Sequence, residues 1–329
     1  MAAAASPVLE VRELSTWFET SAGLAKAVDG VSLEVEAGET LCIVGESGCG
    51  KSVTALSIMG LVPHPGKVIG GEVLFRGQNL LAMRERQLAE VRGNQISMIF
   101  QDPGSSLNPV HTVGRQVAEV YRLHKRMSAP EAEAASILML ESTGIADPES
   151  RMRAYPHELS GGMAQRVMIA MALACRPAVL IADEPTTALD VTIQAQILDL
   201  MRDLQRETGT ALILITHDLG VVAEMADHVA VMYAGQIVEF ANVKTLFADP
   251  QHPYTQALLR SIPAIGERQG MLEVIEGRVP NLTHLPPGCR FAPRCAARVR
   301  ANEPRCLTHV PNLNALGDDH FSRCWLTGA

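Results

Sequence analysis

Residues 45–52 of this 329-residue chain combine three glycines with a lysine and two serines, a set of residues suited to binding phosphate groups. The segment reads G-E-S-G-C-G-K-S and fits the pattern G-x-x-x-x-G-K-[ST]. Glycine lacks a Cβ atom, so backbone N–H groups can approach a polyphosphate closely. Lys51 is expected to reach the β- and γ-phosphates, and the Ser52 hydroxyl to hold Mg²⁺. The segment predicts a site for ATP, and a glycine-rich turn without a ligand is the alternative.

The elements on either side of this segment are those that a phosphate loop needs. Residues 41–44 form an apolar run that predicts a buried strand, and residues 53–59 have helical spacing. A helix start adds unsatisfied N–H groups and the positive end of the helix dipole, both of which favour an anion. The predicted nucleotide-binding residues here are Gly45, Glu46, Ser47, Gly48, Cys49, Gly50, Lys51, Ser52 and Val53.

Polar side chains follow three further apolar runs, each typical of a buried strand. Asp183 is expected to hold Mg²⁺ through water, and Glu184 to polarise the attacking water as the general base. Gln101 is expected to ligate Mg²⁺ and orient water. His217 is expected to contact the γ-phosphate, although a lone histidine at a strand end is usually structural. The predicted catalytic residues are Glu184, His217, Gln101 and Lys51.

Two further features have both an ordinary and a functional interpretation. Ser160, Gly161 and Gly162 open a helix predicted to run to about residue 174, where a serine cap and two glycines expose backbone N–H groups. Phe18, with Trp17 as the alternative, lies at the edge of two antiparallel strands predicted over residues 8–18 and 26–35. Such an aromatic ring either stacks on a nucleotide base or only packs against the sheet.

Composition limits the class of protein. The chain is 47% hydrophobic and 19% charged, and its net charge of −8 argues against extended nucleic-acid binding. No uninterrupted apolar run reaches the ~18 residues that a membrane-spanning helix needs. The first residues lack the basic start and apolar core of a secretory signal, so we expect a cytoplasmic location.

The order of these motifs resembles that of an ATP-binding-cassette ATPase. The resemblance rests on residues 45–52, Gln101, 159–163, 180–184, 188–190 and His217. It implies an α/β P-loop fold, with a RecA-like core, an antiparallel β subdomain and a helical insertion. It also implies a head-to-tail dimer in which each phosphate loop faces Ser160, Gly161 and Gly162 of a second cassette, and it adds Asp190 to the nucleotide-binding residues.

More narrowly, the chain is similar to the ATP-binding subunits of bacterial dipeptide and oligopeptide importers, those of dipeptide permeases in particular. The similarity rests on residues 44–55, 99–109, 155–199 and 252–259. It implies a second, related ATPase subunit, two permease subunits, a periplasmic peptide-binding protein and a peripheral place on the cytoplasmic face of the inner membrane. A nickel or glutathione importer shares much of the pattern, and a cassette ATPase outside transport is a third alternative.

The chain is expected to divide into a nucleotide-binding domain, residues 1–260, with a helical subdomain at about 102–164, and a small irregular extension, residues 261–329. Four cysteines lie in the extension, at Cys289, Cys295, Cys306 and Cys324. A reducing compartment disfavours disulfides, and zinc sites generally use closer spacing. A [4Fe–4S] cluster accepts irregular spacing, and the arginines of the extension would offset its charge. The family resemblance also points to iron–sulfur, so this cluster is expected, with zinc as the alternative.

Overall fold

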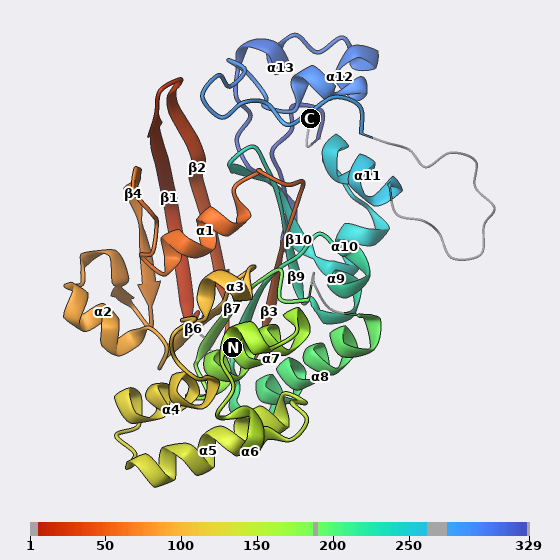
Figure 1. The fold of residues 1–329 in the computed structure, drawn as a ribbon. Coiled ribbons are helices and arrows are strands. Elements are labelled where there is room, and N and C mark those ends of the chain that lie inside the picture. The colour runs from red at the N-terminus through yellow and green to blue at the C-terminus, as the bar shows by residue number, and fades with distance from the viewer. Residues whose placement is uncertain (1–5, 187–189, 262–274, 328–329) are drawn as a thin grey trace. The chain divides into compact units, whose positions relative to one another are not determined.

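A computed structural model describes residues 6–186, 190–261 and 275–327 (Figure 1). The chain forms two compact units. The first unit comprises Met1–Leu9, Val35–Glu39 and Ala82–Ile215, and the second comprises Glu10–Glu34, Thr40–Leu81 and Thr216–Ala329. The sequence predicts a division at residue 260, and neither of these two units ends there. That division stays a prediction.

Three short parallel strands form the centre of the first unit. They are β6 (Ile96–Ile99), β7 (Val179–Asp183) and β8 (Ala211–Ile215). β7 pairs with both of the others, and every residue of the three strands is buried. Continuous apolar sequence is typical of strands that are covered on both faces. This pairing brings the carboxyl ends of the strands to one edge of the sheet.

Helices make up most of the rest of the first unit. They are α2 (Glu85–Val91), α3 (Pro103–Ser106), α4 (Val113–His124), α5 (Ala129–Ser142), α6 (Pro148–Arg151), the short 3₁₀ helix η2 (Pro156–Glu158), α7 (Gly161–Leu173) and α8 (Val191–Thr208). Buried side chains of α4, α5 and α7, among them Val117, Leu140 and Val167, share one hydrophobic core. The insertion expected from the helical pattern therefore has a core of its own.

The helical pattern that the sequence shows from residue 113 to residue 141 is divided into two helices. α4 ends at His124 and α5 begins at Ala129. Ser128 caps α5 together with Glu131, whose carboxylate accepts hydrogen bonds from the backbone N–H and the hydroxyl of Ser128 at 2.8 and 2.6 Å. A proline in the first turn suits a helix start, because the N–H that it lacks would have no partner there.

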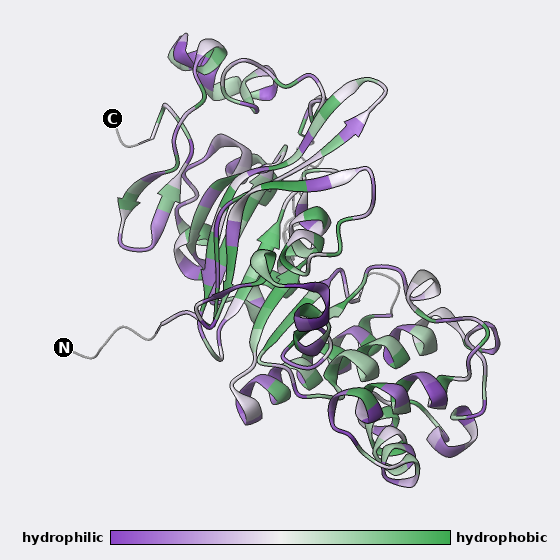
Figure 2. Ribbon diagram, turned by 90° about the vertical axis from the view of Figure 1, so that its left-hand side faces the viewer, coloured by the Kyte–Doolittle hydropathy of each residue, from purple (hydrophilic) through white to green (hydrophobic). Residues whose placement is uncertain are grey.

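The second unit contains two groups of strands. β1 (Leu9–Thr20), β2 (Gly23–Val35), β4 (Gly66–Phe75) and β5 (Gln78–Asn79) form a sheet in the order β2-β1-β4-β5. The second group pairs in the sequence β3 (Thr40–Val44), β9 (His228–Tyr233), β10 (Gln236–Asn242), β12 (His320–Ser322) and β11 (Asn314–Gly317). β3 and β9 are parallel and the other pairs of this group are antiparallel. Figure 2 shows hydrophobic residues along many of the strands.

The helices of the second unit are short. They are α1 (Lys51–Ile58), η1 (Leu80–Ala82, which reaches the unit boundary), α9 (Leu219–Met225), α10 (Val243–Ala248), α11 (Pro253–Arg260), η3 (Ala292–Arg294), α12 (Ala296–Ala301) and α13 (Arg305–Thr308). The C-terminal part is less irregular than its composition predicts, because β12 pairs with β10. Among the described residues, no helix is both long and apolar enough to cross a membrane.

Candidate nucleotide-binding site

The predicted phosphate loop connects β3 to α1, and two of its glycines are required by the backbone. Gly45 has φ 150° and Gly50 has φ 110°, values that L residues rarely adopt. A Cβ atom at Gly45 would lie 2.2 Å from the carbonyl oxygen of Met232, and one at Gly50 would lie 2.2 Å from that of Ala27. The loop therefore passes directly against the backbone of β9 and β2, and only glycine fits at these two positions.

Lys51 begins α1 and folds back over the loop that precedes it. Its Nζ atom donates hydrogen bonds to the carbonyl oxygens of Gly45, at 2.8 Å, and Glu46, at 3.1 Å. Its side chain is buried, as is the thiol of Cys49, whose pKa is raised by that burial. Ser52 and Val53 follow in the first turn of α1. The arrangement holds one ammonium group against the backbone that is expected to receive phosphates.

Glu46 is bound by two residues that the sequence pattern did not indicate. Its backbone N–H donates to the hydroxyl of Tyr254 at 2.9 Å. Its carboxylate accepts two hydrogen bonds from Arg294, at 2.7 and 3.0 Å. Tyr254 and Arg294 follow Glu46 by 208 and 248 residues. No local spacing could have identified them, although Tyr254 lies in a stretch that carried the family resemblance.

The first unit brings Gln101 and Glu184 together. β6 and β7 are neighbours, so the residues that follow them lie at the same edge, and the Gln101 side-chain amide donates to Glu184 Oε2 at 3.1 Å. Glu184 has φ 48°, and its N–H donates to the carbonyl of Ile215 at the end of β8. Asp183 is the buried last residue of β7. Because of this left-handed backbone conformation, Glu184 does not continue β7, and its side chain lies at the end of the strand.

A second group of predicted residues surrounds the start of α7. The Ser160 hydroxyl caps this helix by accepting from the N–H of Met163 at 3.3 Å, and Asp190 caps α8 in the same way through Ile193 at 3.0 Å. A cavity of about 420 Å³ lies between them, and its lining includes Ser160, Gly162, Arg166 and Asp190. Gly161 has open space around its Cβ position. Ala188 and Leu189, part of the same motif, lie outside the described residues.

His217 and the aromatic candidates lie in the second unit. His217 is exposed and precedes Asp218, which caps α9. Phe18, on β1, approaches Gly66 at the start of β4, where an added Cβ would meet the ring at 2.5 Å. Trp17 lies under the ammonium of Lys26, 4.6 Å from the ring centroid. Both rings therefore have packing partners, and stacking on adenine stays a prediction.

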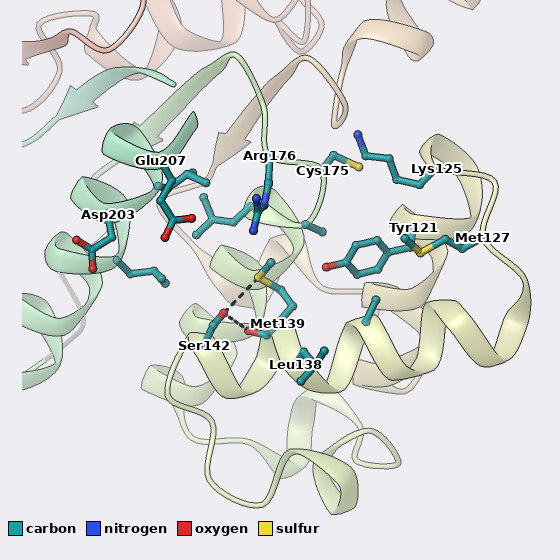
Figure 3. A pocket seen from close by; sticks show the side chains of 15 residues that line it. Tyr121, Lys125, Met127, Leu138, Met139, Ser142, Cys175, Arg176, Asp203 and Glu207 are labelled. Atoms are coloured by element: carbon teal, nitrogen blue, oxygen red, sulfur yellow. Dashed lines mark hydrogen bonds between the residues drawn. The ribbon is translucent and has the colours of Figure 1, made fainter. Parts of the chain in front are cut away.

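A larger cavity, of about 760 Å³, lies in the first unit and contains none of the predicted site residues (Figure 3). Tyr121, Leu138 and Met139 from α4 and α5 provide an apolar wall. Lys125 and Arg176 carry positive charge there, and Asp203 and Glu207 of α8 carry negative charge. This mixed lining does not select one ligand chemistry, so the size of the cavity does not make it the functional site.

Two family models match parts of this chain. A family model described as ABC transporter matches residues 28–187, and one described as Oligopeptide/dipeptide transporter, C-terminal region matches residues 238–301. The fold and the site define a P-loop ATPase of the cassette type. The chain belongs to the ABC transporter family, among its peptide transport ATP-binding proteins.

The similar curated proteins span nearly the whole chain. The probable peptide ABC transporter ATP-binding protein y4tR of Sinorhizobium fredii is 56% identical over 97% of this chain and 94% of its own length. The dipeptide transport ATP-binding protein DppD of Bacillus subtilis is 51% identical over 97% of this chain and 94% of its own. The oligopeptide transport ATP-binding protein AppD of the same organism is 51% identical over 98% and 97%.

A solved structure supports the fold. The ATP-binding cassette MJ0796, described as a dimeric post-hydrolysis state bound to ADP and Pi, has a TM-score of 0.66 and 26% identity. The match covers 71% of this chain and 98% of that one. The predicted P-loop cassette fold is confirmed.

The expected [4Fe–4S] cluster at Cys289, Cys295, Cys306 and Cys324 is wrong. Within residues 6–186, 190–261 and 275–327, no group of three or more His, Cys, Asp and Glu side chains is placed to hold a metal ion, and the relatives are not described as iron–sulfur proteins. Burial raises the pKa of Cys289 to about 12 and that of Cys306 to about 11, and the charges of the neighbouring cysteines also raise both values. These side chains are buried or half-buried thiols, and the zinc alternative falls on the same finding.

Proposed function

We propose that this chain is the ATP-hydrolysing subunit of an importer that moves dipeptides or oligopeptides across the bacterial inner membrane. One observation carries the assignment: the chain matches peptide transport ATP-binding proteins over 97% of its length, including the C-terminal region named for such transporters. The phosphate loop supports the assignment as an ATPase. At Gly45 and Gly50 the loop lies so close to neighbouring backbone that a Cβ atom would not fit.

The residues present suit ATP with Mg²⁺. Gly45 and Gly50 let the loop pass directly against the backbone of β9 and β2, and Lys51 adds a positive charge beside the loop. Ser52 and Gln101, with Asp183 acting through water, supply the oxygen atoms that Mg²⁺ prefers. When bound, the ion would neutralise phosphate charge. Phe18 is the proposed contact of the adenine ring.

Hydrolysis is assigned to the residues at the strand ends. Glu184 acts as the general base that accepts a proton from the attacking water. Gln101, which donates to Glu184 at 3.1 Å, orients that carboxylate and the water. His217 contacts the γ-phosphate through a hydrogen bond, and this bond is lost when the phosphate leaves.

The start of α7 is proposed to serve a second cassette. Ser160, Gly161 and Gly162 place backbone N–H groups at the start of a 13-residue helix beside a cavity that Asp190 also lines. We infer that this surface receives the γ-phosphate of ATP held by the phosphate loop of a related ATPase subunit. MJ0796, a cassette of similar fold, is described as dimeric.

The remaining partners follow from the class of transporter. We infer two permease subunits and a periplasmic peptide-binding protein in the assembled complex, with this chain bound peripherally at the cytoplasmic face. The proposed domain division is residues 1–260 for nucleotide binding, with the helical subdomain at about 102–164 as the part that contacts the permeases. Residues 261–329 form the extension.

Uptake in cells tests this assignment. Labelled dipeptide, labelled pentapeptide, nickel and glutathione would be supplied to cells without the gene, complemented by wild type or Lys51→Ala at equal abundance. We expect peptide uptake to be restored by wild type alone. Restored nickel or glutathione uptake with unchanged peptide uptake would retain the ATPase and refute the peptide cargo. Equal rescue by Lys51→Ala would refute the dependence on ATP.

A further inference from the structure

Arg294, in the C-terminal region, forms an ion pair with the second residue of the phosphate loop. Its two terminal nitrogens bond to the two carboxylate oxygens of Glu46, at 2.7 and 3.0 Å. The Arg294 side chain is 6% exposed and the Glu46 side chain 25%. Two parallel charge-assisted hydrogen bonds fix orientation as well as distance. A pair this shielded from solvent is a stronger restraint than a surface salt bridge.

The guanidinium group is itself held rigidly. Its Nε atom donates to the carbonyl of Glu276 at 2.8 Å, and Nη2 donates to that of Ile275 at 3.0 Å. Nη1 lies 3.3 Å from the Tyr233 hydroxyl. The group also lies over the rings of Tyr233 and Phe291, 5.8 and 6.0 Å from their centroids. The Arg294 side chain is thus held in one position, and its ion pair restrains the position of the Glu46 side chain.

Backbone hydrogen bonds connect Glu46 to Lys51, which is expected to bind phosphate, and to Tyr254. The carbonyl oxygen of Glu46 accepts from Lys51 Nζ at 3.1 Å, and its N–H donates to the Tyr254 hydroxyl at 2.9 Å. Side chain, N–H and carbonyl of this one residue are therefore all engaged. A displacement of the Glu46 side chain would move the backbone between Gly45 and Lys51.

We propose that Arg294 is a positioning residue for ATP binding, which acts through Glu46 to hold the phosphate loop in its binding conformation. A loop that is already ordered loses less conformational entropy when a ligand binds, so affinity rises. The C-terminal region is accordingly part of the nucleotide site. This inference rests on the proposed function of the loop as an ATP site.

The test compares the full chain with Arg294→Gln, Arg294→Lys, Glu46→Gln and the double variant Arg294→Gln/Glu46→Gln. Arg323→Gln is the matched control, because Arg323 is also an arginine of the C-terminal region that bonds within the second unit, to the carbonyls of Ile237 on β10 and of Pro311, and these bonds do not involve the loop. Two measurements are made: affinity for a fluorescent ATP analogue, and amide hydrogen exchange of residues 46–51 without nucleotide.

We expect Arg294→Gln to weaken ATP binding about tenfold, which corresponds to ~1.4 kcal/mol. It should also speed amide exchange in the loop, and Arg294→Lys should give an intermediate effect, since lysine keeps the charge but not the paired geometry. The double variant should be no weaker than Glu46→Gln alone, and Arg323→Gln should match wild type in both measurements. KM for ATP should rise in Arg294→Gln while kcat changes less than twofold.

Three outcomes would overturn the inference: wild-type affinity in Arg294→Gln, additive losses in the double variant, or the same loss in Arg323→Gln. Failure of the proposed function looks different, because the wild-type chain would then bind no ATP. In that case the amide exchange of the loop still decides whether Arg294 positions it. A variant that unfolds is recognised by exchange throughout the chain, and Arg294→Lys then serves as the deciding comparison.

Discussion

Adding one methyl group at Gly50 should damage the phosphate loop far more than adding one at Gly48. Gly48 has φ 78°, and no atom lies within 4 Å of its Cβ position. Gly48→Ala therefore costs only the left-handed backbone conformation, about 1–2 kcal/mol. Gly50 has φ 110°, and its Cβ would lie 2.2 Å from the Ala27 carbonyl oxygen and 2.8 Å from Met232 Cε. Overpacking adds about 1–3 kcal/mol.

The contact at Gly50 cannot be relieved by a side-chain rotation alone, because the oxygen of Ala27 belongs to the backbone of β2. We therefore expect Gly50→Ala to lower the free energy of unfolding by about 2–5 kcal/mol in total. The alternative response is a shifted loop that keeps stability and loses ATP affinity. Either response separates this variant from Gly48→Ala.

Urea unfolding without nucleotide measures the first response, with the midpoint converted to free energy at a shared slope. Equilibrium binding of an ATP analogue measures the second. If Gly50→Ala matched Gly48→Ala in both measurements, the steric account of the loop would be refuted. Gly48→Ala in turn is the control for any general effect of a methyl group in this segment.

Two further predictions concern the proposed base and a buried histidine. Glu184→Gln keeps an acceptor for the Gln101 amide, so ATP affinity should stay within twofold while hydrolysis falls about 10²–10⁴-fold; a near-normal rate would remove Glu184 from its role. Burial, and after it the charge of the nearby Arg323, lower the pKa of His252 from 6.5 to about 3. The unfolded chain therefore binds more protons below pH 6.5, and stability should fall by about 2 kcal/mol between pH 7 and pH 5. His252→Asn, which can still cap α11, should have a lower urea midpoint at pH 7 but a flatter pH dependence; equal slopes would contradict this assignment.

The sequence was sufficient for the features that depend on short segments. Apolar runs predicted the strands β3, β6, β7 and β8, and the residues after them predicted the phosphate loop and the strand-end positions of Gln101 and Glu184. The hydrogen bond between these two side chains is known only from the structure. Neighbouring parallel strands end at one edge, so residues distant in sequence could be grouped without coordinates. The break between α4 and α5 was missed, because helical spacing continued across Ser128.

The restraints on Glu46 could not be predicted, because Tyr254 and Arg294 act through long-range packing that leaves no periodic signal. The cysteine interpretation failed for a related reason. Counts and spacing place four cysteines near one another in sequence, but the burial of each thiol is set by the fold. In the sequence alone, a cysteine whose thiol is buried and protonated cannot be told from a cysteine that binds a metal.

The pairing of β12 with β10 also protects this protein from aggregation. β10 bonds to β9 on one side and to the three residues of β12 on the other. Without the C-terminal hairpin, β10 would be an open edge with unpaired N–H and C=O groups, which is a template for strands of other molecules. The hairpin leaves β11, a strand of four residues, at the edge of the described group instead. A short edge strand offers few N–H and C=O groups for pairing with a strand of another molecule. The C-terminal hairpin therefore limits edge-to-edge association of this sheet with other molecules.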